Sequence, residues 1–270
     1  MGALECAGCA MIAFGAPFSL FVFFIACDPL RVIICVAGAF FWLLSLLVSS
    51  LLWFAMVPLR QSLIFGLLES VFFQEIFRYL YYSLLKKAEL GLDKLSAKGM
   101  HIEGVHSLKN AKHTTALVVG LGFGVISGAF SLINVLADGS GPGTLGLPTA
   151  LGLSQHYATY TFFVTSSLLG AAIILLHIAW NVLFWHGLDQ KNYYMAGAVV
   201  VDHFAVSLVT LCNSYGAYGY TISIVGINLL VIVIWTYKVA GGSLSNFKNA
   251  LVSCLICRCP PPVDPDEQNG

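Results

Sequence analysis

The sequence predicts an all-α integral membrane protein, a bundle of seven transmembrane helices. The chain of 270 residues is 58% hydrophobic and 10% charged, with a mean hydropathy of +0.85, whereas soluble domains carry about a quarter charged residues. Its apolar segments are continuous runs of roughly 20 residues, and inside lipid only helices or closed barrels satisfy every backbone group. Barrels require alternating patterns, so the continuous runs favour helices.

Hydropathy predicts seven spans, which together form a single membrane domain of residues 1–257. The N-terminus has Glu5 as its only charged side chain and lacks the positive segment of a cleavable signal, so we expect an uncleaved first span. The expected spans are residues 9–26, 32–57, 63–85, 114–136, 160–184, 195–212 and 220–239.

Lysine and arginine are distributed unequally between the two sides of this bundle. An odd number of spans places the termini on opposite sides of the membrane. One set of loops, together with the C-terminal tail, holds all of the 13 Lys and Arg side chains except Arg60 and Arg78. The positive-inside rule therefore predicts an N-terminus on the outer or lumenal side and a cytoplasmic C-terminus.

The connecting segments are polar or rich in Gly and Pro. The cytoplasmic segment 86–113 has mixed charge and is expected to be flexible or weakly helical. The outer segment 138–157 contains a turn sequence, Gly141-Pro142-Gly143. Residues 258–270 include three consecutive prolines and are predicted to be a disordered cytoplasmic tail. Three cysteines lie at the start of the tail or just before it, Cys254, Cys257 and Cys259. They are either S-acylated or unmodified.

The fourth expected span carries three glycines at four-residue spacing, Gly120, Gly124 and Gly128. On a helix they lie on one face and form a groove, where another backbone approaches closely enough for dispersion and Cα–H···O contacts. Glycine is common in membrane helices, so a single such pair carries little weight. The tandem spacing, extended by Ser127 and Ser131 on nearly the same face, favours a helix-packing motif.

Ionisable residues inside spans are costly unless paired or hydrated, and they indicate functional sites. Here they are Glu69, Glu75, Arg78, His177, Asp202 and His203. Glu69 lies near the outer interface, where we expect water to reach it. Arg78 lies one turn from Glu75, which predicts an i, i+3 ion pair.

Depth along the spans brings some of these side chains to one level. Counted from the cytoplasmic ends at 1.5 Å per residue, Glu75, His177 and His203 lie at roughly 13 to 17 Å, and Gly124 at about 15 Å. This predicts an intramembrane polar cluster of Glu75, Arg78, His177 and His203. Either these groups satisfy one another in an enclosed cavity, or each histidine bonds a backbone carbonyl separately. We expect the glycine groove to draw the protein's own helices around the cluster.

The same cluster raises the alternative of a metal-dependent intramembrane hydrolase. Glu75, His177 and His203 offer one oxygen and two nitrogen ligands, but no His-Glu-x-x-His or comparable motif supports a metal. Gln74 stands where CAAX-type proteases carry a second glutamate. Asp202 has no facing aspartate of the kind that presenilin-type proteases need, and Val125 replaces the first glycine of the rhomboid Gly-x-Ser-Gly.

Seven spans with an outer N-terminus also describe a G-protein-coupled receptor. Phe77-Arg78-Tyr79 imitates the receptors' Asp-Arg-Tyr element, but Phe77 replaces the acid, and the last span has no Asn-Pro-x-x-Tyr. A bare topology match carries little functional information. Zero net charge and the absence of a basic tract argue against nucleic acid as a partner.

Several strings, in order and spacing, resemble the anterior-pharynx-defective (Aph) family, the seven-span scaffold subunit of gamma-secretase. The resemblance runs from the first span to about Cys257. The strings are Asp28-Pro29-Leu30-Arg31-Val32-Ile33, Gly38-Ala39-Phe40-Phe41-Trp42-Leu43, Leu63-Ile64-Phe65-Gly66, Gln74-Glu75-Ile76-Phe77-Arg78, Leu84-Leu85-Lys86-Lys87-Ala88, Ile126-Ser127-Gly128-Ala129-Phe130-Ser131, Leu175-Leu176-His177 and Ala240-Gly241-Gly242-Ser243. The outer loop 58–62 is shorter than expected for this family, and the tail differs.

The resemblance implies a non-catalytic subunit without cofactor or metal, needed to assemble an intramembrane aspartyl protease. It implies presenilin, nicastrin and the presenilin-enhancer subunit as partners, within membrane lipid, and processing of type I membrane proteins such as Notch and amyloid precursor protein. It also implies location in the endoplasmic reticulum, Golgi and plasma membrane. The family's helix-packing glycines, two intramembrane histidines and third-span glutamate correspond to Gly120, Gly124, Gly128, His177, His203 and Glu75.

Overall fold

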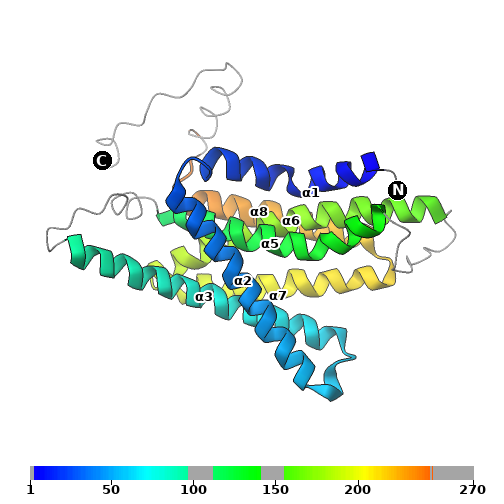
Figure 1. The fold of residues 1–270 in the computed structure, drawn as a ribbon, viewed down its shortest axis with the longest axis horizontal. Coiled ribbons are helices and arrows are strands. Elements are labelled where there is room, and N and C mark those ends of the chain that lie inside the picture. The colour runs from blue at the N-terminus through cyan, green and yellow to red at the C-terminus, as the bar shows by residue number, and fades with distance from the viewer. Residues whose placement is uncertain (1–2, 97–111, 141–154, 244, 246–270) are drawn as a thin grey trace.

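The structure, a computed structural model, describes residues 3–96, 112–140, 155–243 and 245 (Figure 1). Within these ranges the chain is all-helical and contains no strand, which confirms the all-α class for the described part. The α-helices are α1 (Ala3–Phe24), α2 (Pro29–Ala55), α3 (Leu63–Ser96), α5 (Lys112–Ser140), α6 (Gln155–Asp189), α7 (Tyr193–Thr210) and α8 (Tyr218–Val239). Short 3-10 helices follow α2 and α7, η1 (Val57–Leu59) and η2 (Leu211–Tyr215).

Six of these helices are long and apolar enough to cross a membrane, namely α1, α2, α5, α6, α7 and α8. The described part of the chain is therefore that of a multi-pass membrane protein. α3 does not belong to this set, because Glu69, Glu75 and Arg78 interrupt its apolar stretch. Length and apolar character alone thus identify six spans, and α3 needs a separate argument.

Several helices extend beyond the expected spans. α1 begins at Ala3 instead of residue 9. α3 continues from the expected end at residue 85 to Ser96, because the following Leu, Lys, Ala and Glu residues are strong helix formers. α5 continues to Ser140, and α6 covers Gln155–Asp189 instead of 160–184. Residues 97–111, the Gly141-Pro142-Gly143 turn, the tail and the three cysteines near it lie outside the described residues.

Helix boundaries follow local capping chemistry. Asp28 precedes α2, and its Oδ1 accepts hydrogen bonds from the backbone N–H groups of Leu30 and Arg31, at 3.0 and 3.4 Å. Pro29 occupies the first turn, where no backbone donor is needed. Asn192 caps α7 in the same way through the N–H of Met195. These caps fix the sharp turns between α1 and α2 and between α6 and α7.

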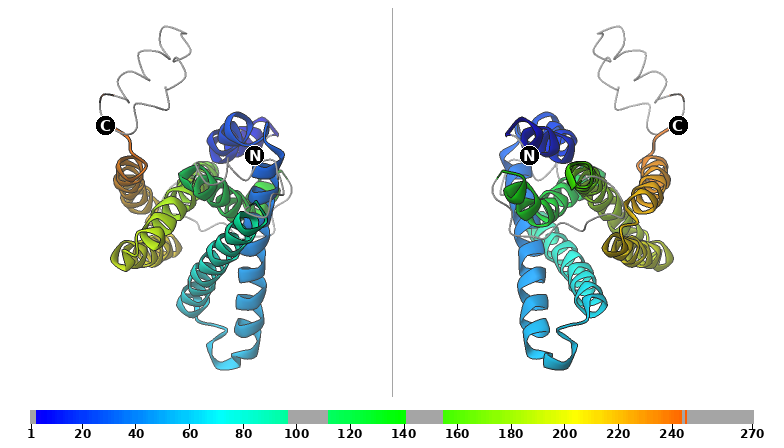
Figure 2. Two further views of the ribbon diagram at one scale, coloured as in Figure 1. Left: turned by 90° about the vertical axis from the view of Figure 1, so that its left-hand side faces the viewer. Right: turned by 90° about the vertical axis from the view of Figure 1, so that its right-hand side faces the viewer.

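α5 and α6 form the centre of the bundle (Figure 1). α5 packs along α6 on one side and against α2 on another, while α1 packs against both central helices. α7 and α8 pack against α6, and Figure 2 shows the α2–α3 hairpin leaning away from them. The hydrophobic core accordingly lies around α5 and α6, with Phe123, Trp180 and Leu183 fully buried.

Candidate functional site

The glycines of α5 lie against α6 of the same chain. A Cβ added at Gly120 would stand 2.7 Å from Ile178 Cα, and one at Gly124 would stand 2.6 Å from the carbonyl oxygen of Ile174. Both obstacles are backbone, which has no rotamer with which to move aside. At Gly128 the added Cβ would meet the far end of the Ile174 side chain, which is flexible. The three glycines thus permit a close helix crossing, with the strictest demand at Gly120 and Gly124.

A second glycine contact joins α5 to α2. A Cβ at Gly122 would collide with the carbonyl oxygen of Cys35, and a Cβ at Gly38 would stand 3.0 Å from the carbonyl oxygen of Val119. The four-residue spacing does not include Gly122, which lies on another face of α5 from Gly120 and Gly124. Two glycine faces therefore hold α5 close to two neighbours at once.

The predicted polar residues come together beside this crossing. Glu75 Oε1 lies 3.2 Å from Arg78 Nη2 and 2.6 Å from His203 Nδ1. The same Arg78 nitrogen lies 3.2 Å from His177 Nδ1. One continuous network therefore connects α3, α6 and α7, and in it both histidines bond side chains and not separate backbone carbonyls.

The network is buried and has aromatic rings at its edges. Arg78, His177 and His203 are 1, 1 and 4% exposed, and Glu75 is 7% exposed. The two imidazole rings cross edge to face with centroids 5.1 Å apart. The Trp180 ring lies 4.5 Å from that of His203 and 5.4 Å from that of His177. These contacts fix the orientation of both histidines.

Donor and acceptor roles in the network follow from the fixed partners. A guanidinium only donates, so His177 Nδ1 accepts from Arg78 and its proton resides on Nε2. A carboxylate only accepts, so His203 Nδ1 donates to Glu75. One carboxylate charge then balances one guanidinium charge. Three buried atoms, Glu75 Oε2 and Arg78 Nε and Nη1, have no protein partner within the described residues, and ordered water would satisfy them.

A cavity of about 180 Å³ adjoins the network between α3, α6 and α7. His203 and Trp180 belong to its lining, so the network borders space large enough for several water molecules. Polar groups line much of the remainder. The lining residues are Leu67, Ser70, Val71, Gln74, Ile173, Trp180, His203, Val206, Ser207 and Thr210.

Asp202 belongs to a separate hydrogen-bonded group. Its Oδ2 accepts from Trp180 Nε1 at 2.7 Å and from Asn228 Nδ2 at 3.1 Å, which ties α7 to α6 and α8. Asp202 therefore points away from its neighbour His203, as the 100° rotation between consecutive helical residues requires. Trp180 links the two groups, since its ring contacts His203 and its N–H binds Asp202.

Sequence reasoning missed several polar residues here. Asn181 donates from Nδ2 to the carbonyl oxygen of Ala116 at 2.7 Å and so binds α6 to α5. Gln74 accepts from Trp42 Nε1 at 3.1 Å, between α3 and α2. Trp180 and Asn181 follow His177 by three and four residues, which places them on its face of the helix, and this spacing could have identified them.

The expectation that water reaches Glu69 is wrong for this structure. The residue is 7% exposed, because α3 turns this face toward α2. Depth from the helix end predicted its level but not its direction around the helix. Burial places Glu69 inside the α2–α3 hairpin.

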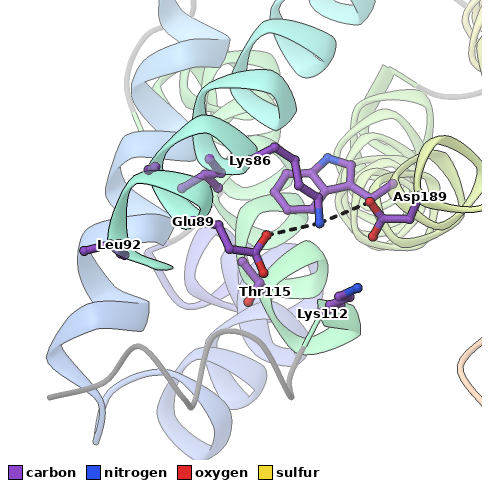
Figure 3. A pocket seen from close by; sticks show the side chains of 9 residues that line it. Lys86, Glu89, Leu92, Lys112, Thr115 and Asp189 are labelled. Atoms are coloured by element: carbon purple, nitrogen blue, oxygen red, sulfur yellow. Dashed lines mark hydrogen bonds and ion pairs between the residues drawn. The ribbon is translucent and has the colours of Figure 1, made fainter. Parts of the chain in front are cut away.

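A charged network lies toward the C-terminal end of α3, just beyond the expected span. Lys86 Nζ lies 3.3 Å from Glu89 Oε2 and 3.1 Å from Asp189 Oδ1, so it bridges α3 and α6 (Figure 3). Tyr82 donates to the same Asp189 oxygen at 2.6 Å. Burial lowers the pKa of Lys86, but bonding to Asp189 and Glu89 outweighs it, and the net pKa is raised. The small cavity beside this bridge holds about 60 Å³.

Glu75 Oε1 and the Nδ1 atoms of His177 and His203 are already bonded within the cluster. A metal ion bound through these three atoms would have to displace Arg78 from His177 Nδ1 and a proton from His203 Nδ1. Within the described residues, no group of three His, Cys, Asp or Glu side chains is placed to hold a metal ion. The arrangement fits a hydrogen-bonded structural cluster better than a hydrolytic metal centre.

Known proteins resemble this chain along most of its length. A sequence model of the Aph-1 protein family matches residues 4–243. The chain is 47% identical over 247 residues to a Drosophila melanogaster protein named gamma-secretase subunit Aph-1, covering 92% of this chain and 97% of that one. It is 41% identical over 260 residues to the Homo sapiens gamma-secretase subunit APH-1B, covering 93% of each chain.

A relative of lower identity is also matched along most of its length. The Caenorhabditis elegans gamma-secretase subunit aph-1 is 35% identical over 262 residues, covering 93% of this chain and 85% of that protein. The matched region includes every helix that the structure describes and both glycine faces of α5. This chain belongs to the Aph-1 family.

Proposed function

We propose that the protein is a non-catalytic, stabilising subunit of the gamma-secretase complex. The match to the Aph-1 family over residues 4–243 carries this conclusion, because the relatives matched along nearly their whole length are themselves named gamma-secretase subunits. The geometry agrees with a structural role. The buried side chains of the polar cluster bind one another. Tight glycine contacts hold α5 close to α6 and α2.

The finer topology that we propose has seven spans, with the N-terminus outside and the C-terminus cytoplasmic. α3 is then the third span. Its Glu75 and Arg78 form an ion pair at 3.2 Å, and Glu75 also binds His203 of α7, so its charged groups have partners inside the bundle. Pairing of this kind reduces the cost of placing them in a membrane.

The partners follow from the family resemblance and are likewise proposals. We expect binding to nicastrin and assembly with presenilin and the presenilin-enhancer subunit, and processing of Notch and amyloid precursor protein by the complex. The corresponding locations are the endoplasmic reticulum, the Golgi and the plasma membrane. Gly120, Gly124 and Gly128 would support assembly by fixing α5 against α6, while Glu75, Arg78, His177 and His203 would hold α3 and α7 in place.

Co-purification in mild detergent tests this proposal. The tagged full-length chain, expressed in cells that lack their own Aph-1 subunit, is expected to retain presenilin, nicastrin and the presenilin-enhancer subunit. Gly124→Leu should abolish co-purification, because even a Cβ there meets backbone at 2.6 Å. Gly226→Leu is the matched control, since nothing lies within 4 Å of its added Cβ. Absence of all three proteins from the wild-type preparation would refute the subunit role.

Metal analysis separates the hydrolase alternative from the scaffold. A metal-dependent hydrolase would carry one zinc per chain, and His177→Ala with His203→Ala would remove it. We expect no stoichiometric zinc in either preparation. Stoichiometric zinc in the wild-type protein that is absent from the double variant would refute the purely structural role.

A further inference from the structure

An apolar groove opens between α1 and α2, away from the polar cluster. The two helices diverge from their connecting turn, and both lie against α5 (Figure 1). The groove has a volume of about 360 Å³, and apart from the Cys35 thiol its side chains are hydrocarbon. Its lining residues are Phe14, Pro17, Phe18, Phe21, Cys35, Val36, Ala39, Leu121, Gly122, Val125 and Ile126.

From this groove we infer a binding site for one phospholipid, with an acyl chain between α1 and α2 and the phosphate at Arg31. The floor of the groove is the tight contact between α2 and α5 at Gly122. A Cβ added at Gly122 would collide with the carbonyl oxygen of Cys35. Its rim is open to the bilayer, with Phe18 66% and Val36 63% exposed. This site is independent of the proposed subunit role.

The height of the groove fits a lipid tail better than a partner helix. Its α1 side runs from Phe21 to Phe14, about 5 to 15 Å from the end of that helix at 1.5 Å per residue. The hydrocarbon core is about 30 Å thick, so the groove is confined to one leaflet. A partner span would cross both leaflets, whereas the tail of one phospholipid ends near the midplane.

A cation lies at the end of the groove where a headgroup would be. Arg31 Nη1 donates to the carbonyl oxygen of Phe24 at 2.8 Å, and its Nε lies 3.1 Å from Asp28 Oδ2, so the guanidinium spans the end of α1 and the start of α2. Its side chain is 35% exposed. A guanidinium has five N–H donors, so these two contacts leave donors for a phosphate. Asp28 is itself engaged by the N–H groups of α2.

Photolabelling of the purified full-length protein tests the site. The probe is a phosphatidylcholine with a diazirine at mid-chain, and mass spectrometry locates the label. We expect label on peptides containing Phe18, Val36 or Val125, retained after dilution into lipid-free detergent. Ala39→Phe fills the groove and should lower that label at least fivefold. The matched control is Ser50→Phe, an exposed position elsewhere on α2, which should leave it unchanged.

Two further arms keep the test decisive. Val36→Trp fills the groove from an exposed rim position, so it should fold even if Ala39→Phe does not. Arg31→Gln should lower labelling by the phospholipid but not by a fatty acid carrying the same diazirine, which separates the headgroup contact from the tail contact. Equal labelling of wild-type and filled variants would overturn the site. So would a photoreactive residue at position 36 that cross-links to a partner protein in place of lipid.

Discussion

At the scale of single residues, the polar cluster is a balanced set of charges. Glu75 and Arg78 are the charged pair, and His177 and His203 each use one nitrogen to bind a member of that pair. Removing one partner leaves the other charge buried without compensation, which commonly costs about 3–5 kcal/mol. Removing both avoids that penalty.

A double-mutant cycle on this pair should therefore be strongly non-additive. We expect Glu75→Gln and Arg78→Gln each to destabilise the protein by about 3 kcal/mol or more, and the double variant to be less destabilised than the sum. The measurement is the unfolding free energy in detergent, with co-purification of the proposed partner subunits as a second readout. Strictly additive losses would contradict the ion-pair geometry.

Sequence reasoning predicted much of this cluster at the residue scale. A rise of 1.5 Å per residue, counted from the helix ends, places Glu75, His177 and His203 at one level. It failed for Glu69, because depth does not give direction around a helix whose neighbours are unknown. It also missed Asn181, whose backbone partner Ala116 on another helix carries no sequence signal.

At the scale of helices, the glycine contacts of α5 differ in what they tolerate. Gly120→Ala and Gly124→Ala place a Cβ against backbone atoms, whereas Gly128→Ala meets only the tip of Ile174. We expect the first two to destabilise by about 1–3 kcal/mol and the third by clearly less.

Thermal unfolding of the single variants measures this gradient. Gly226→Ala is the control, where open space and higher helix propensity should make the change neutral or slightly stabilising. If Gly128→Ala were as harmful as Gly124→Ala, steric contact with α6 would not be the reason for these glycines.

The charged bridge at the far end of α3 should hold that helix to α6. The pKa of Lys86 is raised, so its cationic form is favoured in the folded state. The resulting stabilisation is complete below its unfolded-state pKa and is lost only as the pH rises through the folded-state pKa. Between pH 6 and 9 its contribution should therefore be constant.

Hydrogen exchange over residues 86–96 checks this expectation. Lys86→Gln should speed exchange there to the same extent at pH 6 and pH 9, after correction for intrinsic rates. Lys87→Gln changes the neighbouring exposed lysine and should have little effect. A difference between the pH values would show that another titrating group controls this end of α3.

At the scale of the whole molecule, two exposed cysteines report on topology. Cys27 lies between α1 and α2, and Cys212 lies between α7 and α8. Seven spans place five helices between them, hence opposite sides of the membrane. If α3 did not span, both would lie on the same side.

In single-cysteine variants at the cell surface, a membrane-impermeant maleimide should therefore label Cys212 and not Cys27. After permeabilisation both should react, which controls for reactivity. Labelling of both in intact cells would contradict the proposed seven-span arrangement. Labelling of Cys27 alone would contradict the proposed orientation.

The fold class and the approximate position of each helix were predictable from hydropathy, because lipid allows few alternatives to an apolar helix. The polar segment beyond residue 85 is expected to be flexible or weakly helical, whereas α3 continues as a regular helix to Ser96. Where a helix extends beyond the hydrocarbon core of the membrane its residues are polar, so hydropathy does not reveal that part of the helix. The divergence of α1 from α2, which forms the apolar groove, depends on packing against α5 and could not be predicted from either helix alone.

The hydrogen bond between Glu75 of α3 and His203 of α7 also bears on synthesis. Glu75 meets His203 across 128 positions of sequence, so the ribosome has released α3 long before α7 exists. In the proposed seven-span arrangement, Glu75 would therefore enter the bilayer with Arg78 of the same helix as its partner. It would gain its second partner, His203, only once α7 has been made.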